Sequence, residues 1–256
     1  MGSVREGSSE LGNILDAEAR PDADFTTEDD GAGNEIARIS VLQNTVDTSG
    51  ENLLNGSDTE DALFGLGGDD TLNGLGGRDW LVGGRGNDLL RGGEDDDILA
   101  GRIGNDRMLG GNGDDILNGG QGRDRINGGA GDDTLTGGAS IDRFIFNSNN
   151  PFPTVDIGVD TITDFNEGQD LILLDLTTFA ALSSTPGDGF SVGGEFAVVA
   201  LDADADTSSA LIVQSTETGS LFYNPDGTAV GFGNGAEFAN VGTGVTLTAS
   251  DFVLRA

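Results

Sequence analysis

Residues 110–136 read GGNGDDILN GGQGRDRIN GGAGDDTLT, which is one nine-residue unit written three times in succession. Glycine occupies the first, second and fourth positions of the unit, aspartate the sixth and an apolar residue the eighth. The period of nine continues in both directions without a slip and gives ten copies over residues 56–145. Gly/Asp-rich disorder is the alternative interpretation, but disorder does not keep three residue classes in phase. The period therefore predicts a solenoid of stacked short units.

Two positions of the unit carry the chemistry and the core. The sixth-position aspartates are Asp61, Asp70, Asp79, Asp88, Asp97, Asp106, Asp115, Asp124, Asp133 and Asp142. The eighth-position apolar residues are Leu63, Leu72, Leu81, Leu90, Leu99, Met108, Leu117, Ile126, Leu135 and Phe144.

The unit predicts an all-β chain with a parallel β-roll, a right-handed β-helix. Glycines permit a tight turn with unusual dihedrals, and the residues around the eighth position form a short strand whose apolar side chain points inward. Two units complete one coil. Ten units then give about five coils, stacked at the ordinary strand spacing of about 4.8 Å.

Stacking of the coils would align the aspartates in two columns. Asp61, Asp79, Asp97, Asp115 and Asp133 form one column, and Asp70, Asp88, Asp106, Asp124 and Asp142 form the other. Like charges about 5 Å apart repel by roughly 1 kcal/mol in water, and more strongly near a protein surface. The small core does not offset this repulsion together with the entropy of ordering a glycine-rich chain.

A divalent cation between successive turns would remove the repulsion. Calcium is the natural candidate because it is a hard ion that takes carboxylate and carbonyl oxygens. Metal binding and folding would then be one event. We expect disorder at cytosolic calcium and folding at millimolar extracellular calcium, with several ions and at most about eight inter-turn sites in the roll.

Residues 56–145 resemble the RTX, or hemolysin-type calcium-binding, repeats of proteins that Gram-negative bacteria export by type I secretion. The resemblance implies a secreted, extracellular protein that passes through a type I ABC exporter complex. It also implies that Ca²⁺ lies between turns, held by the ten sixth-position aspartates and by loop carbonyls. The carbonyls carried over are those of Gly84, Gly86, Gly111, Gly113, Gly120, Gly122, Gly129 and Gly131.

Some copies depart from the pattern. The first has Ser57 and Thr59 in place of glycine, and the fifth has Asp95 at its fourth position. The sixth carries Arg102 and Ile103, and the tenth carries residues 139–141, Ala-Ser-Ile. We expect incomplete calcium sites at both ends of the roll and at its middle coil.

Composition excludes several classes of function. The chain of 256 residues has 45 acidic residues, 12 basic residues that are all arginine, and a net charge of −33. Without His, Cys or Lys there is no Ser-His-Asp triad, zinc site of the His or Cys type, P-loop or Schiff-base lysine. The acidity disfavours nucleic acid and anionic membranes. No apolar run is long enough to span a bilayer, and no N-terminal stretch has the pattern of a cleaved signal peptide.

The flanks divide the chain into three predicted parts. Residues 1–50 form an acidic leader or cap, in which 36–42 could form a strand or short helix over the first coil or belong to a disordered linker. Residues 51–145 form the roll, and residues 146–256 a β-rich, sandwich-like C-terminal domain. Strand-like runs within that domain are 161–165, 170–174, 196–201, 210–214 and 221–223.

Two C-terminal segments resemble parts of exported RTX proteins. The stretch 160–176, with Asp160-Thr-Ile-Thr-Asp-Phe and Leu174-Asp-Leu, is similar to the segment that follows the roll in serralysin-type proteases. In those proteases the segment usually continues as D-x-I-D-L, whereas this chain has Leu173 in place of the second aspartate. The ending Asp251-Phe-Val-Leu254 is similar to an uncleaved type I secretion signal, and a final edge strand is the alternative.

Two further acidic groups leave alternatives open. Asp202-Ala-Asp204-Ala-Asp206 has the spacing of the start of an EF-hand loop, but Thr207 and Val213 stand where that loop needs Gly and Glu. A solvated acidic loop is the other interpretation. Asp226, in an Asn-Pro-Asp-Gly turn, is interpreted as a turn residue rather than a ligand.

These observations favour a non-enzymatic, secreted calcium-binding protein with an interaction, matrix or signalling role and an extracellular partner still to be found. The alternative is the export and folding tail of a carboxylate-dependent enzyme that acts on polysaccharides, or of another hydrolase. A pore-forming toxin is disfavoured because the chain has no long apolar helices and no lysine to acylate.

Overall fold

The structure is a computed structural model and describes residues 27–29, 35–37, 43–46, 50–147, 158–205, 207–227 and 235–256. The chain divides into two compact units, residues 1–42 and 43–256. In the first, β1 (Thr27–Asp29) pairs in antiparallel fashion with β2 (Glu35–Ala37). Among the described residues, no helix is long and apolar enough to cross a membrane.

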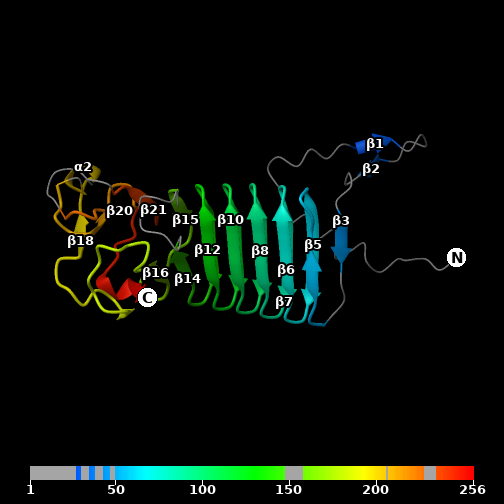
Figure 1. Ribbon diagram of the computed structural model, residues 1–256, viewed down its shortest axis with the longest axis horizontal. Coiled ribbons are helices and arrows are strands. Elements are labelled where there is room, and N and C mark those ends of the chain that lie inside the picture. Colours follow the sequence, from blue (N-terminus) through cyan, green and yellow to red (C-terminus); the bar gives the residue numbers. More distant parts are fainter. Residues whose placement is uncertain are drawn as a thin grey trace. The chain divides into compact units, whose positions relative to one another are not determined.

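The second unit is a roll of two parallel sheets whose strands alternate along the chain (Figure 1). Each repeat supplies one strand, and paired strands are 18 residues apart, as in Met108↔Ile126 and Leu117↔Leu135. Two repeats therefore make one coil, as predicted. The repeat strands are β5 (Asp61–Gly67), β6 (Thr71–Gly76), β7 (Trp80–Arg85), β8 (Leu89–Glu94), β9 (Ile98–Ile103), β10 (Arg107–Asn112), β11 (Ile116–Gln121), β12 (Arg125–Ala130), β13 (Thr134–Ala139) and β14 (Arg143–Phe146).

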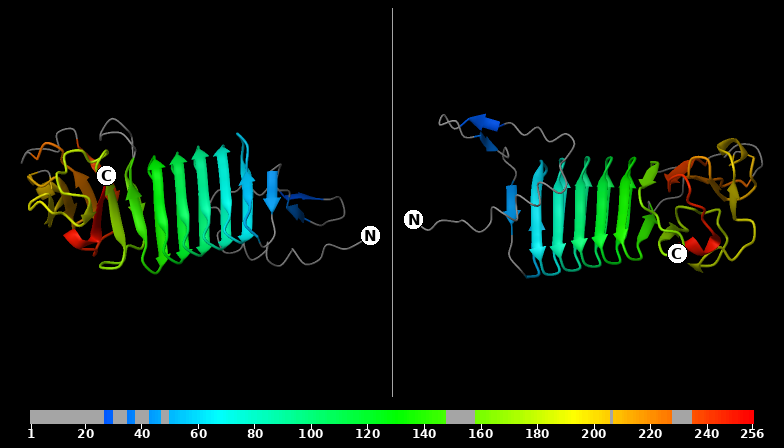
Figure 2. Two further views of the ribbon diagram at one scale, coloured as in Figure 1. Left: turned by 60° about the horizontal axis from the view of Figure 1, so that its bottom comes forward. Right: turned by 180° about the vertical axis from the view of Figure 1, so that it is seen from behind.

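The roll is longer than the ten repeats. At its first end, β3 (Gln43–Val46) pairs with β5 and β4 (Leu53–Asn55) pairs with β6. At its other end, β15 (Asp160–Ile162) and β16 (Leu171–Asp175) add a coil, and β21 (Glu237–Asn240) and β22 (Phe252–Arg255) add another. The parallel β-roll is thus confirmed, and it has about eight coils instead of five because flanking strands continue both sheets. Figure 2 shows the continuous stack from two further sides.

The predicted N-terminal cap is displaced along the sequence. The strand that pairs with the first repeat strand is β3, which begins after the stretch 36–42 that we expected there. Of that stretch, the structure describes only residues 36 and 37, in β2, and residues 38–42 lie outside the described residues.

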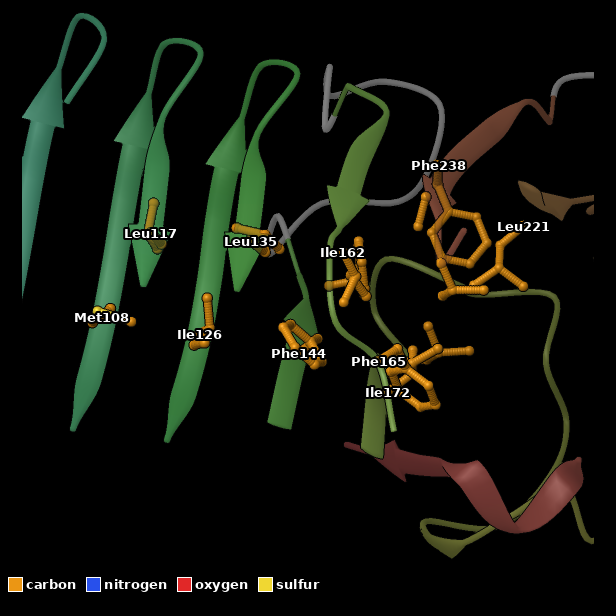
Figure 3. Close-up of a cluster of buried hydrophobic side chains, with 14 of the residues drawn as sticks. Met108, Leu117, Ile126, Leu135, Phe144, Ile162, Phe165, Ile172, Leu221 and Phe238 are labelled. Carbon is orange, nitrogen blue, oxygen red and sulfur yellow. The ribbon is translucent and has the colours of Figure 1, made fainter. Parts of the chain in front are cut away.

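Eighth-position side chains fill the interior of the roll. From Leu54 to Phe144, all of them have an exposed fraction of 4% or less. The row continues through Ile162 and Ile172 into a wider cluster of C-terminal side chains that includes Leu221 and Phe238 (Figure 3). The roll and the C-terminal region therefore share one hydrophobic core.

The C-terminal strands extend the sheets of the roll, whereas a separate sandwich-like region was expected. The expected strand-like runs correspond to β15, β16, β18 (Phe196–Val199), β19 (Ile212–Ser215) and β20 (Ser220–Tyr223). β18 to β21 lie at the end of the eleven-strand sheet, and β17 (Gly187–Asp188) and β22 at the end of the nine-strand sheet. The short helices α2 (Asp202–Ala205) and η1 (Ala249–Asp251) complete this end. Because the core is continuous, these strands close the end of the roll.

Candidate metal columns

The turns between strands depend on left-handed backbone at the second and fourth positions of the unit. All eight glycines proposed as carbonyl donors have positive φ, from 101° at Gly120 to 138° at Gly86. Their coils also approach closely: a Cβ on Gly129 would collide with the carbonyl oxygen of Gly111, and one on Gly131 with that of Gly113. The glycines are therefore required both by dihedral angle and by coil stacking.

The predicted aspartate columns are present. All ten sixth-position aspartates are buried, with exposed fractions of 0–2%. Oδ1 of each later aspartate accepts a hydrogen bond from the backbone N–H of the aspartate 18 residues earlier, as from Asp97 to Asp115 at 2.7 Å and from Asp115 to Asp133 at 2.8 Å. The same bond joins the other pairs within both columns. Oδ1 of the eight later aspartates thus supports the stacking of the coils.

In seven of these aspartates the second carboxylate oxygen, Oδ2, has no hydrogen-bond partner among the described residues. The buried Oδ2 atoms without a hydrogen bond are those of Asp88, Asp97, Asp106, Asp115, Asp124, Asp133 and Asp142. Each lies beside the first-position glycine of its own repeat, at a place that a Cβ would otherwise fill. A buried acceptor without a donor is costly, so seven of them in two rows require an explanation.

The surroundings of these orphaned oxygens suit a calcium ion. A Cβ placed on Gly110 would meet Asp115 Oδ2 and would lie 2.5 Å from the carbonyl oxygen of Gly128 in the next coil. Carboxylate and carbonyl oxygens therefore converge between coils, and calcium takes this donor set. In the described part of the chain, no three carboxylates gather closely enough to hold a metal by themselves. Asp115 and its column neighbours would hold the ion together with carbonyls such as that of Gly128. The charge of the ion would offset the negative charge of the carboxylates.

Burial also raises the pKa values of the column carboxyl groups. The pKa rises to about 6 at Asp88, Asp124 and Asp142. It rises to about 7 at Asp97, Asp106 and Asp133, and to about 8 at Asp115. Loss of hydration is the main cause in every case, partly offset by the backbone N–H that each carboxylate accepts. Ionised columns are therefore unfavourable in the protein alone.

Comparison with protein families agrees with the geometry. The profile of the RTX calcium-binding nonapeptide repeat (4 copies) matches residues 46–81, 73–108 and 109–144. Residues 46–144 of the chain are RTX calcium-binding repeats. Calcium is the ion that this repeat family binds, so the roll is a calcium-binding β-roll.

Other comparisons add little to the function. Among solved structures, the AlgE6R3 subunit of the mannuronan C5-epimerase from Azotobacter vinelandii is 20% identical, over 84% of this chain and 84% of that one, with a TM-score of 0.20. No curated protein matches the chain.

The irregular RTX copies keep the backbone of the regular ones. Asp95, Arg102 and Ser140 occupy glycine positions and have φ values of 74°, 80° and 100°. Leu66 and Leu75 do the same in the second and third copies, at 70° and 87°. These residues accept strain of about 1–2 kcal/mol each instead of changing the coil. Incomplete sites at the irregular copies stay a prediction, but the turn geometry persists there.

Asp61, the first aspartate of its column, differs from the later ones in which carboxylate oxygen is hydrogen-bonded. Oδ2 of Asp61 accepts bonds from the backbone N–H of Ser57 at 2.6 Å and from its hydroxyl at 2.9 Å. The buried atom without a partner is Oδ1 instead. Ser57, which replaces a glycine, thus satisfies the oxygen that is orphaned further along the columns.

Sequence analysis missed two aspartates that extend the columns beyond the repeats. Asp160 Oδ1 accepts a bond from the backbone of Asp133 at 3.3 Å, and Asp170 Oδ1 from that of Asp142 at 2.9 Å. Burial, and then the charge of Asp133, raise the pKa of Asp160 well above its usual value. The signal was available, because Asp160-Thr-Ile162 and Asp170-Leu-Ile172 repeat the aspartate-x-apolar pattern. Six carboxylates per column give five inter-turn positions instead of four.

The isolated acidic groups do not join the columns. Asp202 and Asp204 lie in α2, and Asp202 Oδ1 accepts a bond from the Thr218 hydroxyl at 2.8 Å. Asp206 lies outside the described residues. The Asn224–Gly227 segment forms the expected turn, closed by a bond from Gly227 N to Asn224 O at 3.2 Å.

Proposed function

We propose that this RTX repeat protein is secreted and that its roll folds when it meets extracellular calcium, after which it acts without catalysis as an interaction, matrix or signalling protein. The two rows of buried, unpaired Oδ2 atoms are the observation that carries the calcium-driven folding. A fold that buries so many raised-pKa carboxylates lacks stability until a cation neutralises them.

A matched pair of double variants tests this function. Asp115→Asn with Asp133→Asn removes two neighbouring column charges, whereas Asp114→Asn with Asp132→Asn removes two exposed charges one residue away. The control side chains accept backbone bonds that asparagine also accepts, as Asn87 does from Asn105 at 2.9 Å. Circular dichroism during a calcium titration follows folding. The column variant should raise the calcium midpoint on the order of tenfold or more, and the control by less than about twofold.

Two outcomes would contradict the proposal. The first is full β-structure in chelator with no change on adding millimolar calcium. The second is an equal shift of the calcium midpoint in both variants, which would mean that the column aspartates act only through the net charge of the protein.

The end of the chain is consistent with export before folding. Phe252 and Leu254 in β22 have exposed fractions of 0% and 2% in the folded roll. At cytosolic calcium an unfolded chain would present them to an exporter. Export is tested by expressing the chain with and without a type I ABC exporter complex in a Gram-negative host. Equal amounts in the medium would overturn this part of the proposal.

A further inference from the structure

The outer face of the nine-strand sheet carries a row of three arginines. Arg107, Arg125 and Arg143 occupy the same position of β10, β12 and β14 and are direct register partners. Neighbouring strands lie about 4.8 Å apart, so the three guanidinium groups project from successive rungs. The residues that follow Arg107 and Arg125 on their strands, Met108 and Ile126, are buried in the core. Because successive side chains of a strand point to opposite faces, the arginines lie on the outer face. We call these three residues the arginine row.

From β4 to β14, the described residues place no carboxylate at the outward strand positions of this face, whereas Asp175 stands at an outward position of the neighbouring β16. The outward seventh and ninth positions of β4, β6, β8, β10, β12 and β14 hold Leu53, Asn55, Thr71, Asn73, Leu89, Arg91, Arg107, Leu109, Arg125, Asn127, Arg143 and Ile145. None of these twelve side chains is acidic, although the chain has 45 acidic residues and only 12 basic ones. From β4 to β14 the face is therefore uncharged or positive on an otherwise strongly negative protein.

The arginine row is not neutralised by its surroundings. No carboxylate of the described residues forms a salt bridge with its members, and the buried Nε of Arg125 has no hydrogen-bond partner among them. Burial, followed by the charges of Arg107, Arg255 and Arg143, lowers the pKa of Arg125. Three stacked like charges oppose folding, and nothing in the fold of the described residues requires them.

We propose that the arginine row binds a linear acidic polysaccharide that carries carboxylates on successive sugars. The inference rests on the proposed extracellular interaction role and names the partner's chemistry. A guanidinium binds a carboxylate through two parallel hydrogen bonds, and a regular row of guanidinium groups suits a polymer with regularly spaced carboxylates. Leu109, 37% exposed beside the row, offers an apolar surface to the face of a sugar ring.

The borders of the face favour a thin polymer. Exposed carboxylates stand at both ends of the strands, such as Asp69 before β6 and, on the other side, Glu94 at the end of β8 and Asp114 after β10. A duplex nucleic acid, with about one negative charge per 1.7 Å, would bring phosphates against these carboxylates. An anionic membrane surface would meet the same repulsion across its whole width.

The experiment compares two double variants of equal charge. Arg107→Gln with Arg143→Gln alters the exposed members of the row, and Arg85→Gln with Arg123→Gln removes two exposed arginines outside the row, one at the end of β7 and one in the turn before β12. Both variants change the net charge by two, from −33 to −35. The probe is hexagalacturonate, with maltohexaose as the neutral control, measured by isothermal titration calorimetry in millimolar calcium after circular dichroism has shown that each protein is folded.

Binding to hexagalacturonate should weaken on the order of tenfold or more in the row variant and by less than about twofold in the control variant. Binding should also weaken with added salt, and maltohexaose should not bind. Three results would overturn the inference while leaving the calcium-driven fold intact: a folded protein that does not bind, an equal loss in both variants, or tighter binding of a sulfated hexasaccharide, duplex DNA or phosphatidylserine vesicles. A protein that does not fold in calcium would sink the proposed function, and the inference with it.

Discussion

At the scale of single residues, side chains in left-handed backbone show where the repeat departs from its own rule. Leu75 has a φ of 87° and is 49% exposed, so it carries strain without contributing much burial. The glycine at this position of other copies, such as Gly93, has the same handedness without a Cβ. The irregular copies are therefore places where a single substitution can test the demand for glycine.

Leu75→Gly should raise the free energy of unfolding in millimolar calcium by up to about 1 kcal/mol. Relief of left-handed strain contributes about 1–2 kcal/mol. The greater freedom of glycine in the unfolded chain offsets about 0.5–1 kcal/mol of it. Leu109→Gly, at an exposed strand position outside the left-handed residues, is the control and should lower stability. Urea denaturation measures both, and a loss of stability in both variants would contradict the strain argument.

At the scale of the elements, the period of nine predicts the repeat strands, the two-repeat coil and both aspartate columns. It fails where the spacing changes. Asp160 is 27 residues from Asp133 and Asp170 is 28 from Asp142, whereas column partners inside the repeats are 18 apart. The pairing of β15 with β21, Asp160↔Ala239, spans a still longer stretch of chain. Such pairings depend on the shared core and not on a local pattern, so sequence analysis placed a strand at β15 but neither β21 nor the sheet that joins them.

The columns also predict how folding depends on pH. The folded pKa values of about 6 to 8 lie above the usual 3.8 of an aspartate, so the folded state holds more protons than the unfolded state in this range. The contribution of these groups to stability is thus fully present below about pH 4 and is lost as the pH rises through 6 to 8. In chelator, the β-sheet signal should increase when the pH falls from 8 to 5.

Calcium should show the opposite trend, because it competes with protons for the same carboxylates. The calcium concentration at the midpoint of folding should rise on the order of tenfold or more when the pH falls from 8 to 5.5. Parallel titrations by circular dichroism measure both trends. The Asp115→Asn, Asp133→Asn variant lacks two of the titrating carboxyl groups, so both signals should depend less on pH in this variant. A midpoint that is independent of pH would place the bound calcium away from the columns.

At the scale of the whole molecule, the C-terminal region closes the end of the roll. Phe144 and Phe146 in the last repeat strand have exposed fractions of 0% and 3%, and Phe144 lies 6.1 Å from Phe165 between ring centroids. The rings of Phe146 and Phe238 are 5.3 Å apart. Without residues 158–256, both sheets would end in open edges and this part of the core would meet water.

A chain that ends at residue 147 should therefore fail to fold cooperatively at the calcium concentration that folds the full chain. Exposure of each phenylalanine alone costs about 1.5–3 kcal/mol, and every coil depends on its neighbour for burial. A chain that begins at residue 43 is the control, because residues 43–256 form one compact unit. Calcium titration by circular dichroism with light scattering compares the two. If the shortened roll folded at the same midpoint and stayed monomeric, the metal columns alone would hold the repeats together.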